Sequence, residues 1–146
     1  MTRTHITIDA SSFSPLLRRV QAMGQFDAST LLPRLGEYLQ RSTQERFKTQ
    51  TDPDGAPWAQ LAPHTKKRKK YNPQKILTLR GTLRSQIRYQ VLDKHSVQVG
   101  SALPYAATHQ FGRDAIPARP FVGLSAADRQ EIQAIIADWA AEQGFK

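Results

Sequence analysis

Two stretches with the apolar spacing of amphipathic helices, one in each half of the chain, constrain its fold most. In the first, the apolar residues are Leu31, Leu32, Leu35, Leu39 and Phe47. In the second, they are Ile132, Ile135, Ile136 and Trp139. Each stripe has to be buried against another element, because an isolated amphipathic helix is marginal in water. We expect the first helix to begin after Asp27 or Ser29 and to end near Gln50. The second is expected to be capped by Ser125.

Alternating apolar and polar residues predict the strands that these helices cover. Residues 4–9, 87–92 and 96–100 each show the period-two pattern of a strand with one buried face. The last two flank a short polar segment and are predicted to form an antiparallel hairpin. The predicted fold class is therefore α+β. A small, mainly antiparallel sheet that includes residues 88–92 and 97–100 packs against the long helix and the C-terminal helix.

Shorter patterns predict three more helices and several extended loops or arms. Residues 15–23 and 104–112 have helical spacing and are followed or closed by glycine. A further helix is predicted over residues 76–87, in which the apolar positions are Ile76, Leu79, Leu83 and Ile87. Residues 113–120 contain two prolines and are expected to be extended, and residues 121–124 are a candidate edge strand. Trp58 is expected to pin the loop after residue 50 onto the core.

Positive charge is concentrated in one part of the single domain that we assign to residues 1–146. Ten basic residues and one acidic residue lie between Lys66 and Lys94, a local net charge of +9 that equals the excess of the whole chain. Five of them form the run Lys66, Lys67, Arg68, Lys69 and Lys70. The segment at about 64–75 is predicted to be a mobile basic loop that becomes ordered only in an assembly. Three more, Arg80, Arg84 and Arg88, form a row on the helix predicted over residues 76–87.

Three interpretations of this basic segment remain open. It can contact an acidic protein surface, it can bind nucleic acid without sequence specificity, or it can be a solvated loop. Only Tyr71 and Tyr89 supply aromatic rings within the segment, so base stacking on a single strand has little support.

The residues that would carry catalysis or metal binding are absent or badly spaced. The chain has no cysteine, and none of its four histidines stands three or four residues from another. It contains no Gly-x-Ser-x-Gly motif and no glycine-rich nucleotide loop. We therefore predict no catalytic residue, no metal site and no cofactor, and a protein that is not an enzyme. No apolar run approaches the roughly 20 residues that cross a bilayer, so no membrane contact is expected.

Several segments, in order, resemble the phage virion morphogenesis family, which includes tail completion proteins of P2-like phages and a virion morphogenesis protein of Mu-like phages. The resemblance starts at Phe47 and covers roughly half of the chain. It rests on residues 52–61 (DPDGAPWAQL), 76–87 (ILTLRGTLRSQI), 97–101 (VQVGS), 105–112 (YAATHQFG) and 116–124 (IPARPFVGL).

The resemblance implies a structural virion protein that acts in tail completion and head-to-tail joining. It implies a small α+β domain that assembles into a homo-oligomeric ring and contacts neighbouring neck, connector or tail proteins. The implied location is the neck or tail end of the virion, with assembly in the host cytoplasm. The stoichiometry stays open, because related connector rings differ between sixfold and twelvefold. The alternative is a sequence-independent DNA-binding module that uses residues 66–94.

Four residues outside the basic segment are of types that anchor interfaces. They are Tyr105, Phe111, Arg119 and Phe121. Ordinary core packing is the other interpretation of the aromatic residues. Arg119, between Ala118 and Pro120, is the single residue that we most expect at a protein or DNA interface.

Overall fold

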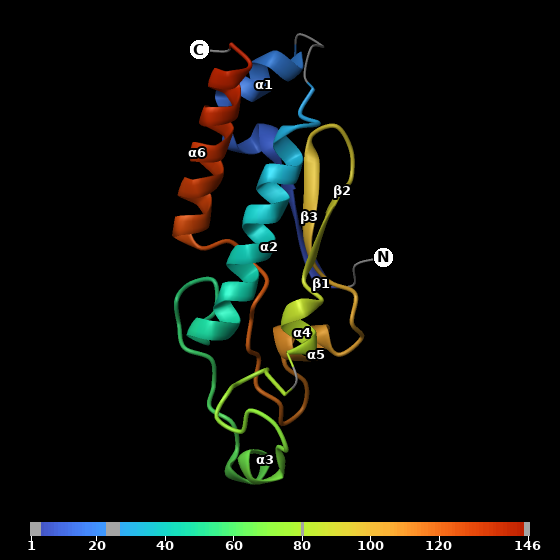
Figure 1. Cartoon of the computed structure of the whole chain (residues 1–146), viewed down its shortest axis with the longest axis vertical. Coiled ribbons are helices and arrows are strands. Elements are labelled where there is room, and N and C mark those ends of the chain that lie inside the picture. Colours follow the sequence, from blue (N-terminus) through green and yellow to red (C-terminus); the bar gives the residue numbers. More distant parts are fainter. Residues whose placement is uncertain (1–3, 23–26, 80, 145–146) are drawn as a thin grey trace.

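A long helix lies between a small sheet and a second long helix (Figure 1). The computed structural model describes residues 4–22, 27–79 and 81–144. In chain order the elements are β1 (Thr4–Asp9), the 3-10 helix η1 (Ala10–Phe13), α1 (Pro15–Ala22), α2 (Leu31–Thr49), α3 (Pro63–Arg68), α4 (Thr82–Ser85), β2 (Arg88–Val91), β3 (Ser96–Ser101), α5 (Ala106–Phe111) and α6 (Ala126–Glu142). The predicted α+β class is confirmed. Among the described residues, no helix is both long enough and apolar enough to cross a membrane.

The sheet is antiparallel, with the strand order β1-β3-β2. All six residues of the central strand β3 are buried, and Val99 faces Ile6 on one side and Tyr89 on the other. The three predicted strands are thus confirmed. The alternating apolar residues located all three, although in β3 the polar residues Ser96, Gln98 and Ser101 are buried as well.

Helix α2 covers the sheet and α6 packs on α2, so the apolar stripes of both helices are buried, except that Ile135 is only partly buried. The predicted cap of α6 is confirmed as a complete capping box. The Asp128 N–H donates to Ser125 Oγ at 2.9 Å, and the Ser125 N–H donates to Asp128 Oδ2 at 3.0 Å. The predicted helix at residues 104–112 is confirmed as α5, with Gly112 at its C-cap.

The helix predicted over residues 76–87 is wrong. Among the described residues of this range, only Thr82–Ser85 is helical, because Leu77 and Gly81 adopt positive φ angles of 55° and 79° that interrupt a right-handed helix. Leu79, assigned to the buried stripe, is 49% exposed. The predicted row of arginines does not form either. Arg84 lies on α4 and Arg88 on β2, and Arg80 lies outside the described residues.

Residues 121–124 do not form the candidate edge strand. The Gln110 side chain takes the place of a neighbouring strand: its Oε1 accepts from the N–H groups of Phe121 and Val122 at 3.0 Å each. Its Nε2 donates to the Val122 carbonyl at 2.9 Å. The backbone is therefore satisfied by one amide side chain.

A buried ion pair joins the two long helices. Arg46 of α2 and Asp128 of α6 are 6% and 1% exposed, and Arg46 Nη2 donates to Asp128 Oδ2. Tyr38 Oη and Ser42 Oγ also donate to this carboxylate, at 2.8 and 2.6 Å. Burial alone would raise the pKa of Asp128, but these hydrogen bonds, that of the Ser125 N–H and the charge of Arg46 outweigh burial and lower it. Burial and the bond to Asp128 raise the pKa of Tyr38 to about 12.

Asp128→Asn should destabilise the fold by about 3–5 kcal/mol at pH 7, because it leaves the buried Arg46 guanidinium without its counter-ion. A carboxylate with a lowered folded-state pKa stabilises the fold above its unfolded pKa of about 3.9 and ceases to do so as the pH falls through the folded value. The difference between wild type and variant should therefore narrow below about pH 4. Urea unfolding across this range measures both effects.

The matched control is Glu142→Gln, which breaks the exposed Arg34–Glu142 pair (2.7 Å) and should change little. Equal urea midpoints for wild type and Asp128→Asn at pH 7 would contradict the role given to the buried pair.

Gly36 allows α2 to approach the sheet closely. A Cβ atom at this position would lie 2.3 Å from Cδ2 of Tyr89 on β2, well inside van der Waals contact. The same approach lets Gln40 Oε1 accept from the Tyr89 N–H at 3.1 Å. The helix thus accepts an unfavourable glycine because the Tyr89 ring needs the space.

Gly36→Ala should cost about 1–3 kcal/mol of stability through overpacking. In a Tyr89→Ala background the same change should instead stabilise the protein by about 0.5–1 kcal/mol, because alanine is the better helix former once the ring is gone. Denaturant unfolding of the four proteins tests this reversal of sign. The same sign in both backgrounds would rule out the contact as the reason for the glycine.

Candidate protein interface

The basic run lies at one end of the long axis of the molecule, on and after α3 (Figure 1). Helix α3 begins at Pro63, follows Ala62 in an extended conformation, and has no buried residue. Proline suits a first helical turn and basic side chains suit the last, where Lys66, Lys67 and Arg68 stand. This helix was not predicted. The mobility of residues 64–75 outside an assembly stays a prediction.

The five residues of the basic run have two different roles. Lys69 turns toward the chain, where its Nζ donates to the carbonyls of Lys75 and Thr78 at 2.5 and 3.0 Å. Burial lowers the pKa of Lys69. In contrast, Lys67, Arg68 and Lys70 are exposed and Lys66 is half-buried. Four of the five are therefore available to a partner, and the other closes the turn after α3.

A groove with a volume of about 810 Å³ lies beside α3. It is lined by residues on and before α3, around α4, in α5 and directly before it, and in the segment after α5: Gln60, Leu61, Ala62, His64, Thr65, Arg68, Lys69, Leu77, Thr78, Leu79, Thr82, Leu83, Tyr105, His109, Ala115, Ile116, Pro117 and Arg119. Its apolar contributors include Leu61, Leu77, Leu79, Leu83 and Ile116. Burial, and then the charge of Arg119, lower the pKa of His109, and among the described residues its buried Nδ1 has no hydrogen-bond partner. The groove therefore combines an apolar lining with cationic side chains.

The four predicted anchor residues divide into two exposed and two buried side chains. Tyr105 is 43% exposed and lines the groove, and Phe111 is 74% exposed. Phe121 is fully buried, and its ring centroid lies 5.5 Å from that of Phe47. It is a core residue, so core packing, the other interpretation of the aromatic residues, holds for Phe121 and its place among the interface candidates is corrected.

Arg119 is also a structural residue, which corrects its place as the foremost interface candidate. It is 7% exposed, and burial lowers its pKa. Its Nε and Nη2 donate to the carbonyls of Ala59 and Gln60 at 2.8 and 3.0 Å. Nearby, Trp58 Nε1 donates to the Pro120 carbonyl at 2.7 Å, so the prediction that Trp58 pins this loop is confirmed. These bonds fix one wall of the groove.

Two further basic residues predicted as site residues, Arg84 on α4 and Arg88 on β2, have exposed side chains. Arg88 Nη1 donates to the Ser85 carbonyl at 2.5 Å, which ties the arginine to the turn before β2. Residues 55–92 contain no acidic residue at all. The charge is therefore unopposed along the chain, although the helical row that was predicted to present it is absent.

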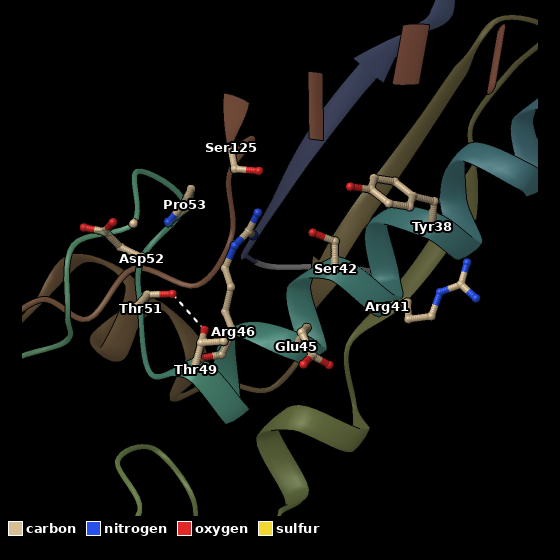
Figure 2. Close-up of a pocket in the computed structure, with 11 residues that line it drawn as sticks. Tyr38, Arg41, Ser42, Glu45, Arg46, Thr49, Thr51, Asp52, Pro53 and Ser125 are labelled. Carbon is tan, nitrogen blue, oxygen red and sulfur yellow. Dashed lines mark hydrogen bonds between the residues drawn. The ribbon is translucent and has the colours of Figure 1, made fainter. Parts of the chain in front are cut away.

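A second, polar pocket of about 420 Å³ lies between α2, residues 51–55 and Ser125. Figure 2 shows the Arg46 side chain extending from α2 toward the segment that carries Ser125, with Arg41 pointing away. In this pocket Asp52 Oδ1 accepts from the N–H groups of Asp54 and Ala56, each at 2.9 Å. Among the described residues, no group of three His, Cys, Asp or Glu side chains could hold a metal ion. The polar pocket is thus built from groups that stabilise the fold.

Comparison with known proteins agrees with this picture. The model of the phage virion morphogenesis family matches residues 8–140. The chain belongs to this family. It is 32% identical over 133 residues to the putative capsid assembly protein G of Escherichia phage Mu, covering 80% of this chain and 85% of the relative. It is 29% identical over 114 residues to the Mu-like prophage FluMu G protein 1 of Haemophilus influenzae, covering 75% and 77%. No solved structure matches the chain significantly.

Family membership gives the protein a role in phage structure or assembly. The match includes α2, the sheet strands β2 and β3, the groove and most of α6. The groove and the buried Arg46–Asp128 pair thus both lie inside the family's domain.

Arg119→Gln should loosen residues 58–62, because the loss of two charge-assisted bonds removes about 1–3 kcal/mol of local stabilisation. Hydrogen exchange of these amides should accelerate in the variant. The control is Arg113→Gln, which changes an exposed arginine on the same segment and should leave the exchange unaltered. Unchanged exchange in Arg119→Gln would contradict the structural role.

Proposed function

We propose that this protein is a non-enzymatic component of the virion neck or tail end that completes the tail and joins heads to tails. The observation that carries the proposal is the α3 end of the molecule. Helix α3 has no buried residue and belongs to a stretch of chain without acidic residues. The apolar groove lies beside it. In a family that acts in virion morphogenesis, such an end is suited to contact a neighbouring protein.

A ring of identical subunits, contacting neck, connector or tail proteins, is the assembly we propose. Exposed apolar residues also occur outside the groove: Val91 at the end of β2, Leu92 directly after it, and Phe111 at the end of α5. A contact between two different surfaces of adjacent subunits closes into a ring when the rotation between the subunits allows it. The proposed location is the virion, with assembly in the host cytoplasm.

Protein contact accounts for the α3 end better than DNA binding does. A sequence-independent DNA surface needs cations that neutralise phosphates and has no use for an apolar groove. The exposed Leu79 and Ile116, 49% and 44% accessible, are typical of a protein interface. Binding to passing DNA remains the second candidate because the local charge favours it.

Replacement of Lys66, Lys67, Arg68 and Lys70 by Gln should block joining of heads to tails while the fold stays intact, because exposed charges contribute little to stability. Lys69 is kept because it closes the turn. Joined particles are counted after mixing heads and tails with each protein, and thermal unfolding checks the fold. The matched control replaces four exposed basic residues elsewhere, Arg18, Arg19, Lys48 and Arg129, by Gln. Normal joining with the first variant would refute the assembly role.

The DNA alternative gives a different result in the same set of proteins. If the four cations hold phosphates, wild type should bind random duplex DNA with a log–log salt slope of about −3.6, from about −0.9 per contact. The slope should approach zero in the first variant and persist in the control. Weak DNA binding that is equal in both variants would favour the protein contact.

A further inference from the structure

The groove beside α3 has a volume of about 810 Å³ and holds no part of the chain. We infer that it is a docking site for a short acidic segment with apolar anchors, supplied by a different morphogenesis protein. The inference rests on the proposed function and names the chemistry of its partner. Three observations support the inference: the lining of the groove, the charge around the groove, and the charge balance of the rest of the chain.

The lining calls for apolar anchors. Leu79, Ile116 and Tyr105 are 49%, 44% and 43% exposed, although they line a recess rather than a convex surface. A volume of about 810 Å³ is of the size that takes a few inserted side chains. Covering these residues would remove apolar area from water, so an occupant with two or three aliphatic or aromatic side chains gains affinity there.

The surroundings call for acidic residues. Arg68, Lys69 and His64 line the groove, and Lys66, Lys67 and Lys70 stand beside them on and after α3. Asp114, the acidic residue nearest in sequence to the 115–119 wall, is largely exposed and lies 3.8 Å from the Nε of Arg113. Charge complementarity therefore selects an acidic occupant and speeds its encounter with the groove.

A second copy of the same chain is a poor occupant. Outside residues 66–94 the chain contains eleven basic and eleven acidic residues. Its acid-rich stretch, residues 130–144, belongs mainly to α6, where Ile132, Ile136 and Trp139 are buried and cannot serve as anchors. Its other exposed apolar pair, Val91 and Leu92, is followed by one acidic and one basic residue, Asp93 and Lys94. The partner with matching charge is thus a different protein.

Three labelled synthetic peptides test the inference by fluorescence anisotropy with the full-length protein. Each has about twelve residues, a length typical of groove-binding segments. The first alternates Glu with Leu and Phe anchors, the second has Ser in place of the anchors, and the third has Lys in place of Glu. The first should bind at least about tenfold more tightly than either of the others. Equal binding of the first and second peptides, or no binding of the first, would overturn the inference.

Variants place the binding site. The double change Leu79→Ser and Ile116→Ser should weaken binding of the first peptide about tenfold, because the apolar anchors of the peptide lose contact with two half-exposed groove residues. The matched control, Val91→Ser with Leu92→Ser, removes a similarly exposed pair outside the groove and should bind as wild type does. An equal loss in both variants would overturn the assignment to the groove. Because all four side chains are partly exposed, these proteins should fold, which circular dichroism checks.

Other occupants give outcomes of their own. Sedimentation measures self-association of wild type and of the Leu79 and Ile116 variant. Self-association that the two changes abolish would identify a second copy as the occupant of the groove and overturn the inference. If duplex DNA displaced the first peptide as readily as the unlabelled peptide does, binding would depend on charge alone. That result would also overturn the inference. A further outcome is that the peptides fail to bind while the variant at Lys66, Lys67, Arg68 and Lys70 still fails to join heads to tails. That combination would overturn this inference and support the proposed function.

Discussion

The carboxylate of Asp128 is the group on which the arrangement of the long helices depends. It caps α6, accepts from two hydroxyl groups of α2 and pairs with Arg46. Arg46 in turn donates through Nη1 to the Phe121 carbonyl at 2.8 Å, which carries the network into the segment before α6. Buried charges are tolerated only when their bonds are made, and here each oxygen of the carboxylate accepts at least two. The pair therefore sets the position of α6 on α2.

From this network a series of contacts leads to the groove. Phe121 packs on Phe47, whose ring is edge-on to Trp58 at 5.3 Å. Trp58 and Arg119 then bond the backbone of each other's segments. Beyond them, single side chains hold the backbone: Gln50 Oε1 accepts from the Ile76 N–H at 2.5 Å. The core is thus stabilised by burial, and the α3 end by polar side chains bonded to backbone, which leaves its apolar residues free for a partner.

The sequence predicted those parts of the structure in which apolar residues recur at one constant spacing over many positions. Apolar residues recur every 2 residues in the strands and at helical spacing in the long helices, and the Ser125 cap has a local signature. In β3 the intervening polar residues are buried too, which the alternation does not reveal. The same rule failed at residues 76–87, where two positive φ angles override spacings of three and four. The groove and the role of Arg119 depend on segments about sixty residues apart, for which a single sequence holds no signal. Arg46 was likewise missed, because a charged residue on an amphipathic helix gives no sign of a buried partner.

The charge distribution favours one order of steps in the proposed assembly, in which the partner binds before the ring closes. In a ring, the basic ends of neighbouring subunits would approach one another, and each like-charge pair about 10 Å apart costs roughly 0.4 kcal/mol in water before screening. Salt at physiological strength, with a Debye length of about 8 Å, reduces this cost without removing it. Acidic segments in the grooves would neutralise the basic ends before the subunits close. Binding of the partner and closure of the ring would then favour each other, because each lowers the electrostatic cost of the other. A subunit with a neutral α3 end would lose this coupling, so its rings would form without waiting for the partner.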